Sequence, residues 1–110
     1  MMTIIHDEAC AHYLRPGHPE APFRVVESAR VLAERHPGWD WMKPDEAPDR
    51  AILRAHTAHH LMEVDHPLDD FDGDTPAYED IGRIARLGAG SALAAVRLAG
   101  SGAKSFSLMR

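Results

Sequence analysis

The chain has 110 residues, of which 45% are hydrophobic and 26% are charged, and its formal net charge is −5. This composition is typical of a soluble globular protein of one domain at most. The negative charge argues against a nucleic-acid partner, which usually needs a basic patch, and no window approaches the ~20 apolar residues of a membrane span. The single Cys10 excludes an internal disulfide and no signal peptide is visible, so we expect a cytoplasmic protein.

The beginning of the chain predicts a strand, a long loop and a helix. Residues 3–5 form a short buried strand, and a loop of about a dozen residues, rich in proline, covers 11–22. Pro22 suits the first position of a helix that ends at His36-Pro-Gly38. The apolar residues of this helix recur at helical spacing: Phe23, Val25, Val26, Ala29, Leu32 and Ala33.

A second strand and two short helices are predicted next. Residues 39–42 form the strand, whose two tryptophans alternate between its faces. Residues 48–55 and 57–64 read as the helices, and a loop rich in acids and turn formers follows at 68–76.

The strongest helical signal covers residues 78–99, with Asp74 or Thr75 as the predicted N-cap and Pro76 at the first turn. One predicted face repeats at helical spacing: Tyr78, Ile81, Ile84 or Ala85, Gly88, Ala92, Ala95 or Val96, and Ala99. The helix also contains three glycines: Gly82, Gly88 and Gly90. Each costs about 1 kcal/mol relative to alanine, so we expect close packing against a sheet to compensate.

This order of elements predicts an α/β fold, a three-layer structure with about three parallel strands and flanking helices. The last strand, residues 105–110, would be an exposed edge. In open α/β sheets the chemistry lies in loops beyond the carboxyl ends of the strands, and the loop that should follow Arg110 is missing from the sequence. We therefore interpret residues 1–110 as one partial domain, the front of an enzyme that stops before its active site.

Five motifs occur in a distinctive order. They are His12 with His18-Pro-Glu-Ala-Pro-Phe-Arg24, Ile52-Leu53 with His56-Thr57, Asp72-Gly-Asp-Thr-Pro76, the long small-residue helix, and Phe106-Ser-Leu-Met-Arg110. In this order the chain resembles the N-terminal third of a zinc-dependent histone deacetylase-like amidohydrolase. That superfamily includes acetylpolyamine deacetylases and shares its fold with arginase. The resemblance covers nearly the whole chain and implies the N-terminal portion of the arginase/deacetylase fold.

The resemblance implies hydrolysis of an N-acetyl amide, either acetyl-lysine or an acetylpolyamine, with zinc as the cofactor of the full-length family. The family's catalytic histidines follow the equivalent of this last strand, in a Pro-Pro-Gly-His-His stretch. Its zinc ligands (an Asp-x-His pair and a second Asp) and an oxyanion-stabilising Tyr lie further on. None of these motifs occurs here, so no catalytic or metal-binding residue is assigned. We expect this chain alone to bind no cofactor and to be inactive.

Three accessory residues can be carried over. Arg24 resembles an arginine beneath the active site, where its charge could draw a carboxylate product; alternatively, it pairs with a nearby acid in the first turn of its helix. Asp74 resembles a rim aspartate that accepts hydrogen bonds from the substrate backbone, or it serves as the helix N-cap. His18 lies in a loop that resembles one at the active-site entrance, or it orders that loop by hydrogen bonds.

Two patterns suggest metal binding, and we interpret both as structural. Residues 70–74 place three aspartates at calcium-loop spacing, but Thr75 and Ile81 stand where such a loop requires Gly and Glu. Three histidines are spaced to meet on a helix: His56, His59 and His60. They lack the glutamate of an H-E-x-x-H motif, so we expect surface or partly buried side chains.

Two functions remain open. In the first, the chain is the N-terminal part of a zinc-dependent deacetylase. In the second, it is a self-standing, non-catalytic module that forms homo-oligomers through its edge strand or the apolar face of helix 78–99. A homo-oligomer is expected for the module because both surfaces need to be covered.

Overall fold

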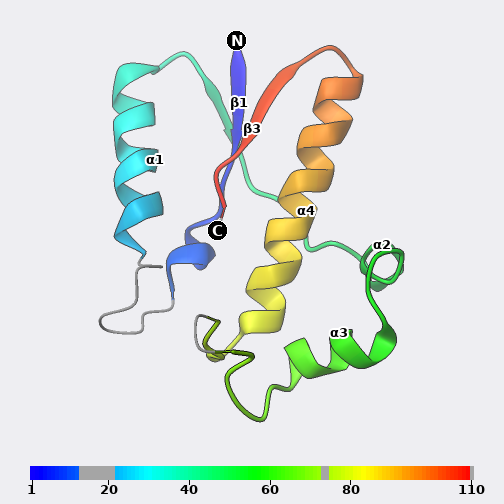
Figure 1. The fold of residues 1–110 in the computed structure, drawn as a ribbon. Coiled ribbons are helices and arrows are strands. Elements are labelled where there is room, and N and C mark those ends of the chain that lie inside the picture. Colours follow the sequence, from blue (N-terminus) through cyan, green and yellow to red (C-terminus); the bar gives the residue numbers. More distant parts are fainter. Residues whose placement is uncertain (13–21, 73–74, 110) are drawn as a thin grey trace.

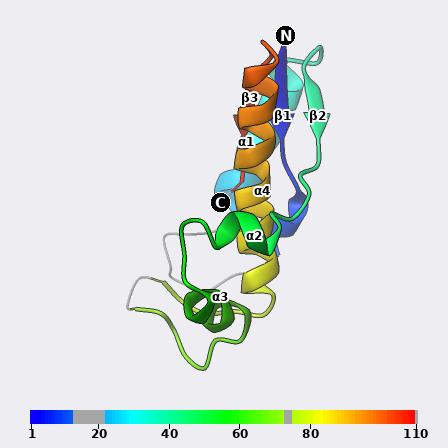
Figure 2. The ribbon, with the colours of Figure 1, turned by 90° about the vertical axis from the view of Figure 1, so that its right-hand side faces the viewer.

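The computed structural model describes residues 1–12, 22–72 and 75–109, which form three layers (Figure 1). A parallel three-stranded sheet lies between helix α1, Phe23–Arg35, on one face and helix α4, Ile81–Gly100, on the other. The turned view shows α4 in front of the strands (Figure 2). The predicted α/β fold class is therefore confirmed.

The sheet has the order β2-β1-β3, so its first strand in sequence lies in the middle. Strand β1 is Met2–Ile5, β2 is Asp40–Met42 and β3 is Lys104–Ser107. Ile4 pairs with both Trp41 and Phe106. Because β1 has a neighbour on each side, Ile4 and Ile5 are fully buried. Strand β3 is an edge of the described sheet, as predicted, and it ends at Ser107, earlier than expected.

Helix α1 packs through a narrower stripe than predicted. Val25 is its buried residue, whereas Phe23 and Val26 are 70% and 53% exposed. Pro22 immediately precedes the helix with helical dihedrals, and its carbonyl accepts hydrogen bonds from Val25 and Val26. The fixed φ of proline thus starts the helix where the sequence indicated.

Three short helical elements connect the layers. The 3-10 helix η1 covers Glu8–Ala11, α2 covers Asp49–Ile52 and α3 covers Ala58–Asp65. Thr57 caps α3, because its Oγ1 accepts a hydrogen bond from the backbone N–H of His60 at 3.1 Å. Helix α2 is shorter than the predicted span of 48–55. Helix α3 is shifted by one residue from the predicted span of 57–64.

Helix α4 begins at Ile81, three residues later than predicted. The expected cap by Thr75 is wrong, since the Thr75 carbonyl instead accepts a hydrogen bond from the N–H of Phe71 within a turn. Asp74 lies outside the described residues. The residue before the helix is Asp80, whose φ of 63° places it in the left-handed region. This left-handed residue lies in the turn that leads directly into α4.

The buried face of α4 also differs from the prediction. Its buried residues are Gly82, Ile84, Leu87, Gly90, Ser91 and Ala94. Ala92, Val96 and Ala99, which were expected on the buried face, are exposed. Because α4 is apolar on two sides, periodicity alone could not identify the side that meets the sheet.

Two glycines of α4 permit close contacts with other segments of the chain. The prediction that they would pack against the sheet is wrong for these two. A Cβ on Gly90 would overlap the backbone carbonyl of Asp45, and one on Gly82 would overlap the carboxylate of Asp65. Beside Gly90, the N–H of Ala47 donates a hydrogen bond to the Arg86 carbonyl at 3.0 Å. The glycines therefore let the chain between β2 and α3 lie directly on α4.

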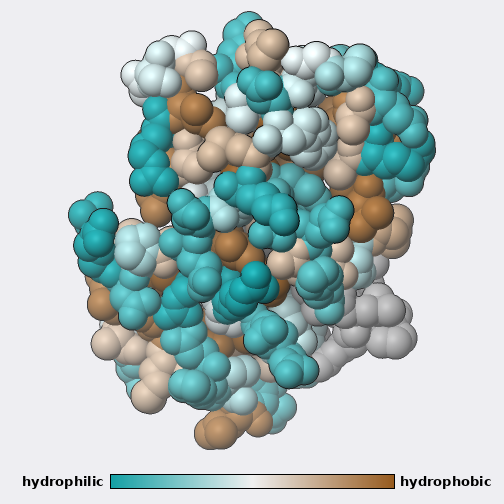
Figure 3. All heavy atoms as spheres, turned by 180° about the vertical axis from the view of Figure 1, so that it is seen from behind, coloured by the Kyte–Doolittle hydropathy of each residue, from teal (hydrophilic) through white to brown (hydrophobic). Residues whose placement is uncertain are grey.

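Seen from behind, the surface is largely hydrophilic, with hydrophobic residues in scattered patches (Figure 3). No helix in the described part of the chain is both long and apolar enough to cross a membrane.

Candidate functional site

The carboxyl ends of β1 and β3 lie side by side and are joined by three contacts. The N–H of Leu108 donates to the Ile5 carbonyl at 2.9 Å, and Nδ1 of His6 donates to the Leu108 carbonyl at 2.8 Å. The backbone N–H of Asp7 lies 3.3 Å from Sδ of Met109. The segment that leaves β3 is thus fixed along the segment that leaves β1. This is the edge at which open α/β sheets place their reactive loops.

A small hydrophobic cluster packs against the segment that follows β3 at this edge of the sheet. Its buried members come from η1, α1 and α4: Ala9, Cys10, Val25, Ile84 and Leu87. Leu108, Met109 and Tyr78 pack against it and are partly buried. Asp7 caps η1 through a 2.9 Å hydrogen bond from the N–H of Ala9 to its Oδ1. The short helix η1 is therefore capped immediately after β1, and its residues Ala9 and Cys10 pack into the cluster.

A polar hollow of about 100 Å³ lies next to this cluster, at the start of α4. It is lined by His12, Tyr78, Glu79, Asp80, Arg83 and Ile84. The left-handed backbone of Asp80 shapes it, and such backbone in a residue other than glycine often marks a functional position. No pattern in the sequence pointed to Asp80. His6 and Asp7, in contrast, could have been found as polar residues directly after a buried strand.

The structure describes one of the three residues transferred from the family. Arg24 lies in the first turn of α1 with an exposed side chain, at the end of the helix that meets η1 (Figure 1). Its backbone carbonyl accepts a hydrogen bond from Oγ of Ser28 at 2.7 Å. His18 and Asp74 lie outside the described residues. The accessory roles of all three therefore remain predictions.

The described residues do not bring together the ligands of a zinc site. Among the residues that the structure describes, no three or more His, Cys, Asp or Glu side chains gather in a way that could hold a metal ion. The histidines of the α3 region are exposed, as expected. The rings of His56 and His60 lie 5.0 Å apart between centroids, and Nε2 of His59 lies 3.1 Å from the Glu63 carboxylate.

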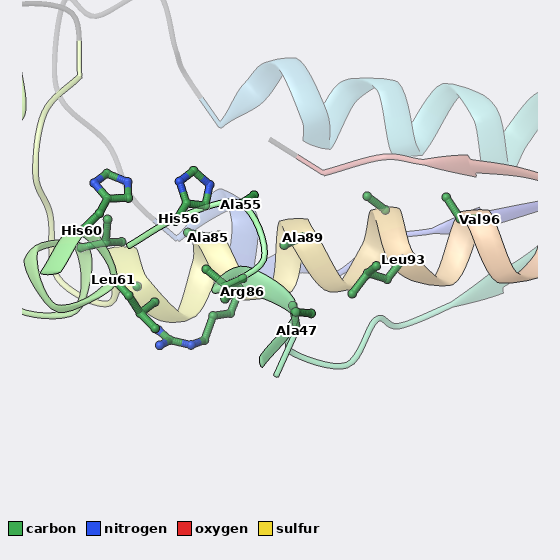
Figure 4. A pocket seen from close by; sticks show the side chains of 15 residues that line it. Ala47, Ala55, His56, His60, Leu61, Ala85, Arg86, Ala89, Leu93 and Val96 are labelled. Atoms are coloured by element: carbon green, nitrogen blue, oxygen red, sulfur yellow. The ribbon is translucent and has the colours of Figure 1, made fainter. Parts of the chain in front are cut away.

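A mostly apolar groove of about 390 Å³ lies on the side of α4 that faces away from the sheet. We call it the α4 groove. Its residues on α4 are Gly82, Ala85, Arg86, Ala89, Ala92, Leu93 and Val96, and those on the opposite wall are Ala47, Ala51, Ile52, Ala55, His56, His60, Leu61 and Val64. Figure 4 shows His56 and His60 near one end and Leu93 and Val96 toward the other.

Arg86 fixes the walls of the α4 groove to one another. Its Nη1 and Nη2 bind the two carboxylate oxygens of Asp65 on α3, and Nη2 also lies 3.1 Å from Oδ1 of Asp49 on α2. The hydrogen bonds to Asp65 raise the pKa of the Arg86 guanidinium, with burial opposing them. The same contact lowers the pKa of the Asp65 carboxyl. Sequence reasoning missed this cluster because its three members lie far apart in the chain.

Comparison with solved structures identifies a relative with the same fold. The HD domain of HDA15, a histone deacetylase, superposes with a TM-score of 0.83 at 29% sequence identity. The match covers 99% of this chain and 35% of that chain, so this chain spans about a third of the length of its relative. In all, 41 chains of solved structures match. No protein-family model and no curated protein sequence matches the chain.

Proposed function

We propose that this chain, which has the fold of the N-terminal part of a histone deacetylase domain, belongs to a hydrolase of N-acetyl amides. The observation that carries the proposal is the TM-score of 0.83 over 99% of the chain. The 29% identity adds sequence similarity to the shared fold. Because the chain spans 35% of its relative, the catalytic activity is proposed for a whole domain and not for these 110 residues alone.

The geometry of the strand ends supports this assignment. A polypeptide that continues from β3 would start beside His6 and Asp7, over the cluster around Cys10. Reactive groups placed there would stand at the carboxyl edge of a parallel sheet. His6 would then act as a positioning residue, because it holds the backbone immediately before the reactive loop.

In such a domain, zinc would polarise the amide carbonyl and lower the pKa of a bound water. The described residues do not hold the metal, so their contribution is support and recognition. We propose that Arg24 attracts the carboxylate product, that Asp74 accepts hydrogen bonds from the substrate, and that His18 borders the entrance. Acetyl-lysine and acetylpolyamines are the proposed substrates, and the cytoplasm is the proposed location.

The first test is to read the source DNA downstream of codon 110 in all three frames. A Pro-Pro-Gly-His-His stretch followed by an Asp-x-His pair in any frame would support the hydrolase. Unrelated sequence in every frame would contradict it and leave the self-standing module.

The second test is an amidase assay on the 110-residue chain with an acetyl-lysine peptide, with and without added ZnCl₂. We expect no turnover above a zinc blank and no rise in Tm, because the described residues provide no metal cluster. The HDA15 HD domain serves as the comparison enzyme. Zinc-dependent turnover by this chain would contradict our assignment of the catalytic centre to residues outside it.

A further inference from the structure

Two exposed histidines meet at the junction between α2 and α3. The ring centroids of His56 and His60 lie 5.0 Å apart, with an angle of 32° between the ring planes. Figure 4 shows the two rings side by side at one end of the α4 groove, with a nitrogen of each ring on the side that faces the other ring. Imidazole is the commonest metal ligand among protein side chains. Two imidazoles in this arrangement can therefore bind one metal ion between them.

The spacing of the two rings fits a metal ion bound to both. A metal–nitrogen bond of about 2.0 Å places each ring centroid roughly 3.2 Å from the ion. With an angle of roughly 90–110° between the two bonds, as in tetragonal and tetrahedral complexes, the centroids lie roughly 4.5–5.2 Å apart. The distance of 5.0 Å between His56 and His60 lies within this range. Both rings can thus reach one ion from the backbone positions that they already occupy.

Hydrogen bonds fix the backbone at both histidines. The N–H of His56 donates to the Ile52 carbonyl at 3.0 Å, in the turn that follows α2. The N–H of His60 donates to Oγ1 of Thr57, the N-cap of α3, at 3.1 Å. His56 lies before the first residue of α3, so the fold of the α2–α3 junction is what brings the two rings together. A metal ion held by both rings would therefore bind the folded chain more tightly than the unfolded chain.

We propose that His56 and His60 form a binding site for a divalent copper ion. Copper binds nitrogen ligands more tightly than the other divalent first-row metals, and it accepts two neighbouring imidazoles in a tetragonal arrangement. Among the described residues, no third His, Cys, Asp or Glu completes a metal-binding group with this pair, so water would fill the remaining positions on the ion. Zinc is usually held by three or four side chains, and we expect it to bind here at least about tenfold more weakly than copper. The site does not depend on the proposed hydrolase.

His59 provides a matched control on the same helix. Its side chain is 73% exposed, and its Nε2 lies 3.1 Å from the Glu63 carboxylate, one turn further along α3. It is therefore a histidine next to His60 in the sequence whose ring has a different partner. Because His56, His59 and His60 are all exposed, replacing each of them by glutamine should leave the Tm of the metal-free chain unchanged.

The first experiment titrates the chain with CuCl₂ in a calorimeter, with glycine present as a weak competitor against non-specific binding. We expect a single copper ion to bind and the Tm to rise. His56→Gln and His60→Gln should each weaken binding at least about tenfold, because one imidazole cannot chelate the ion, whereas His59→Gln should leave it unchanged. If the three variants weaken binding equally, or if none does, the copper is bound elsewhere and the proposal is wrong. A rise in Tm with ZnCl₂ as large as that with CuCl₂ at the same concentration would overturn the assignment to copper.

The second experiment counts the imidazole ligands directly by pulsed electron paramagnetic resonance of the bound copper. The remote nitrogen of each coordinated imidazole modulates the signal, and two such nitrogens produce combination lines. We expect these lines in the unaltered chain and in His59→Gln, and the pattern of a single imidazole in His56→Gln and in His60→Gln. Combination lines that persist in both of these variants, or that are missing from the unaltered chain, would contradict the proposal.

Discussion

Arg86 is the residue through which helices α2, α3 and α4 are held together. Its side chain is 15% exposed, and it binds Asp65, 30% exposed, through both terminal nitrogens. A bidentate guanidinium–carboxylate contact of this kind is stronger than a surface ion pair. Removing the cation would leave a partly buried carboxylate without its partner.

We therefore expect Arg86→Met to lower the free energy of unfolding by about 2 kcal/mol. Asp49→Asn is the control. Its side chain is 67% exposed, so that change should cost less than about 1 kcal/mol. Urea unfolding followed by circular dichroism measures both. If both variants lose the same free energy of unfolding, the contact with Asp65 does not contribute more than an exposed ion pair.

The same contact predicts a dependence on pH. The pKa of Asp65 is lowered from its ordinary value of 3.8 by the hydrogen bonds from Arg86. A carboxyl with a lowered folded-state pKa stabilises the fold fully above its unfolded pKa, and this stability is lost as the pH falls through the folded value. We expect the unfolding free energy to fall below about pH 4. In Asp65→Asn this component should be absent, so a Tm profile as steep as that of the unaltered chain would contradict the assignment.

At the scale of elements, the contact between α4 and the chain near Asp45 depends on a glycine. Gly90 lies so close to the carbonyl of Asp45 that an added Cβ would overlap it, whereas Gly100, at the end of the same helix, has nothing within 4 Å. We expect Gly90→Ala to destabilise the fold by about 1–3 kcal/mol. Gly100→Ala should stabilise it by about 0.5 kcal/mol through helix propensity. Measuring the thermal unfolding of both variants separates the effect of close packing at Gly90 from the effect of helix propensity at Gly100.

Helix α4 and strand β3 are joined by hydroxyl groups. Oγ of Ser91, fully buried, lies 2.5 Å from Oγ of Ser107, and Oγ of Ser105 donates to the Ala95 carbonyl at 3.0 Å. Ser107→Ala should cost about 1 kcal/mol or more, because a buried hydroxyl loses its partner. Replacing both Ser91 and Ser107 by alanine should cost less than the sum of the two single changes. Strict additivity in this double-mutant cycle would argue against the contact.

The sequence predicted the existence of these elements better than their orientation. Strands near residues 4, 41 and 106 were recognisable from short apolar runs bounded by turn formers. The start of α4 was missed, because the chain between Thr75 and Asp80 turns before the helix begins. The face of α4 was also missed, since an alanine-rich helix offers similar apolar stripes on two sides.

At the scale of the whole molecule, the candidate site could be predicted only as a location. The rule that chemistry follows strand ends pointed to the loop after the last strand, which the sequence analysis placed beyond Arg110. The contacts of His6 with Leu108 and of Asp7 with Met109 could not be foreseen. They join residues from opposite ends of the chain, and a single sequence contains no signal for such pairs.

The strand order has a consequence for how the molecule forms. Strand β1 is made before the other two strands and occupies the centre of the sheet, yet its partner Phe106 is synthesised long after it. At roughly 5–20 residues per second on the ribosome, Ile4 waits several seconds for that partner. During this interval the apolar first strand has one open side, so a chaperone that binds short hydrophobic segments would protect it. Because long-range parallel pairing is slow to form, the pairing of β3 with β1 should be the slowest step in the assembly of these three strands.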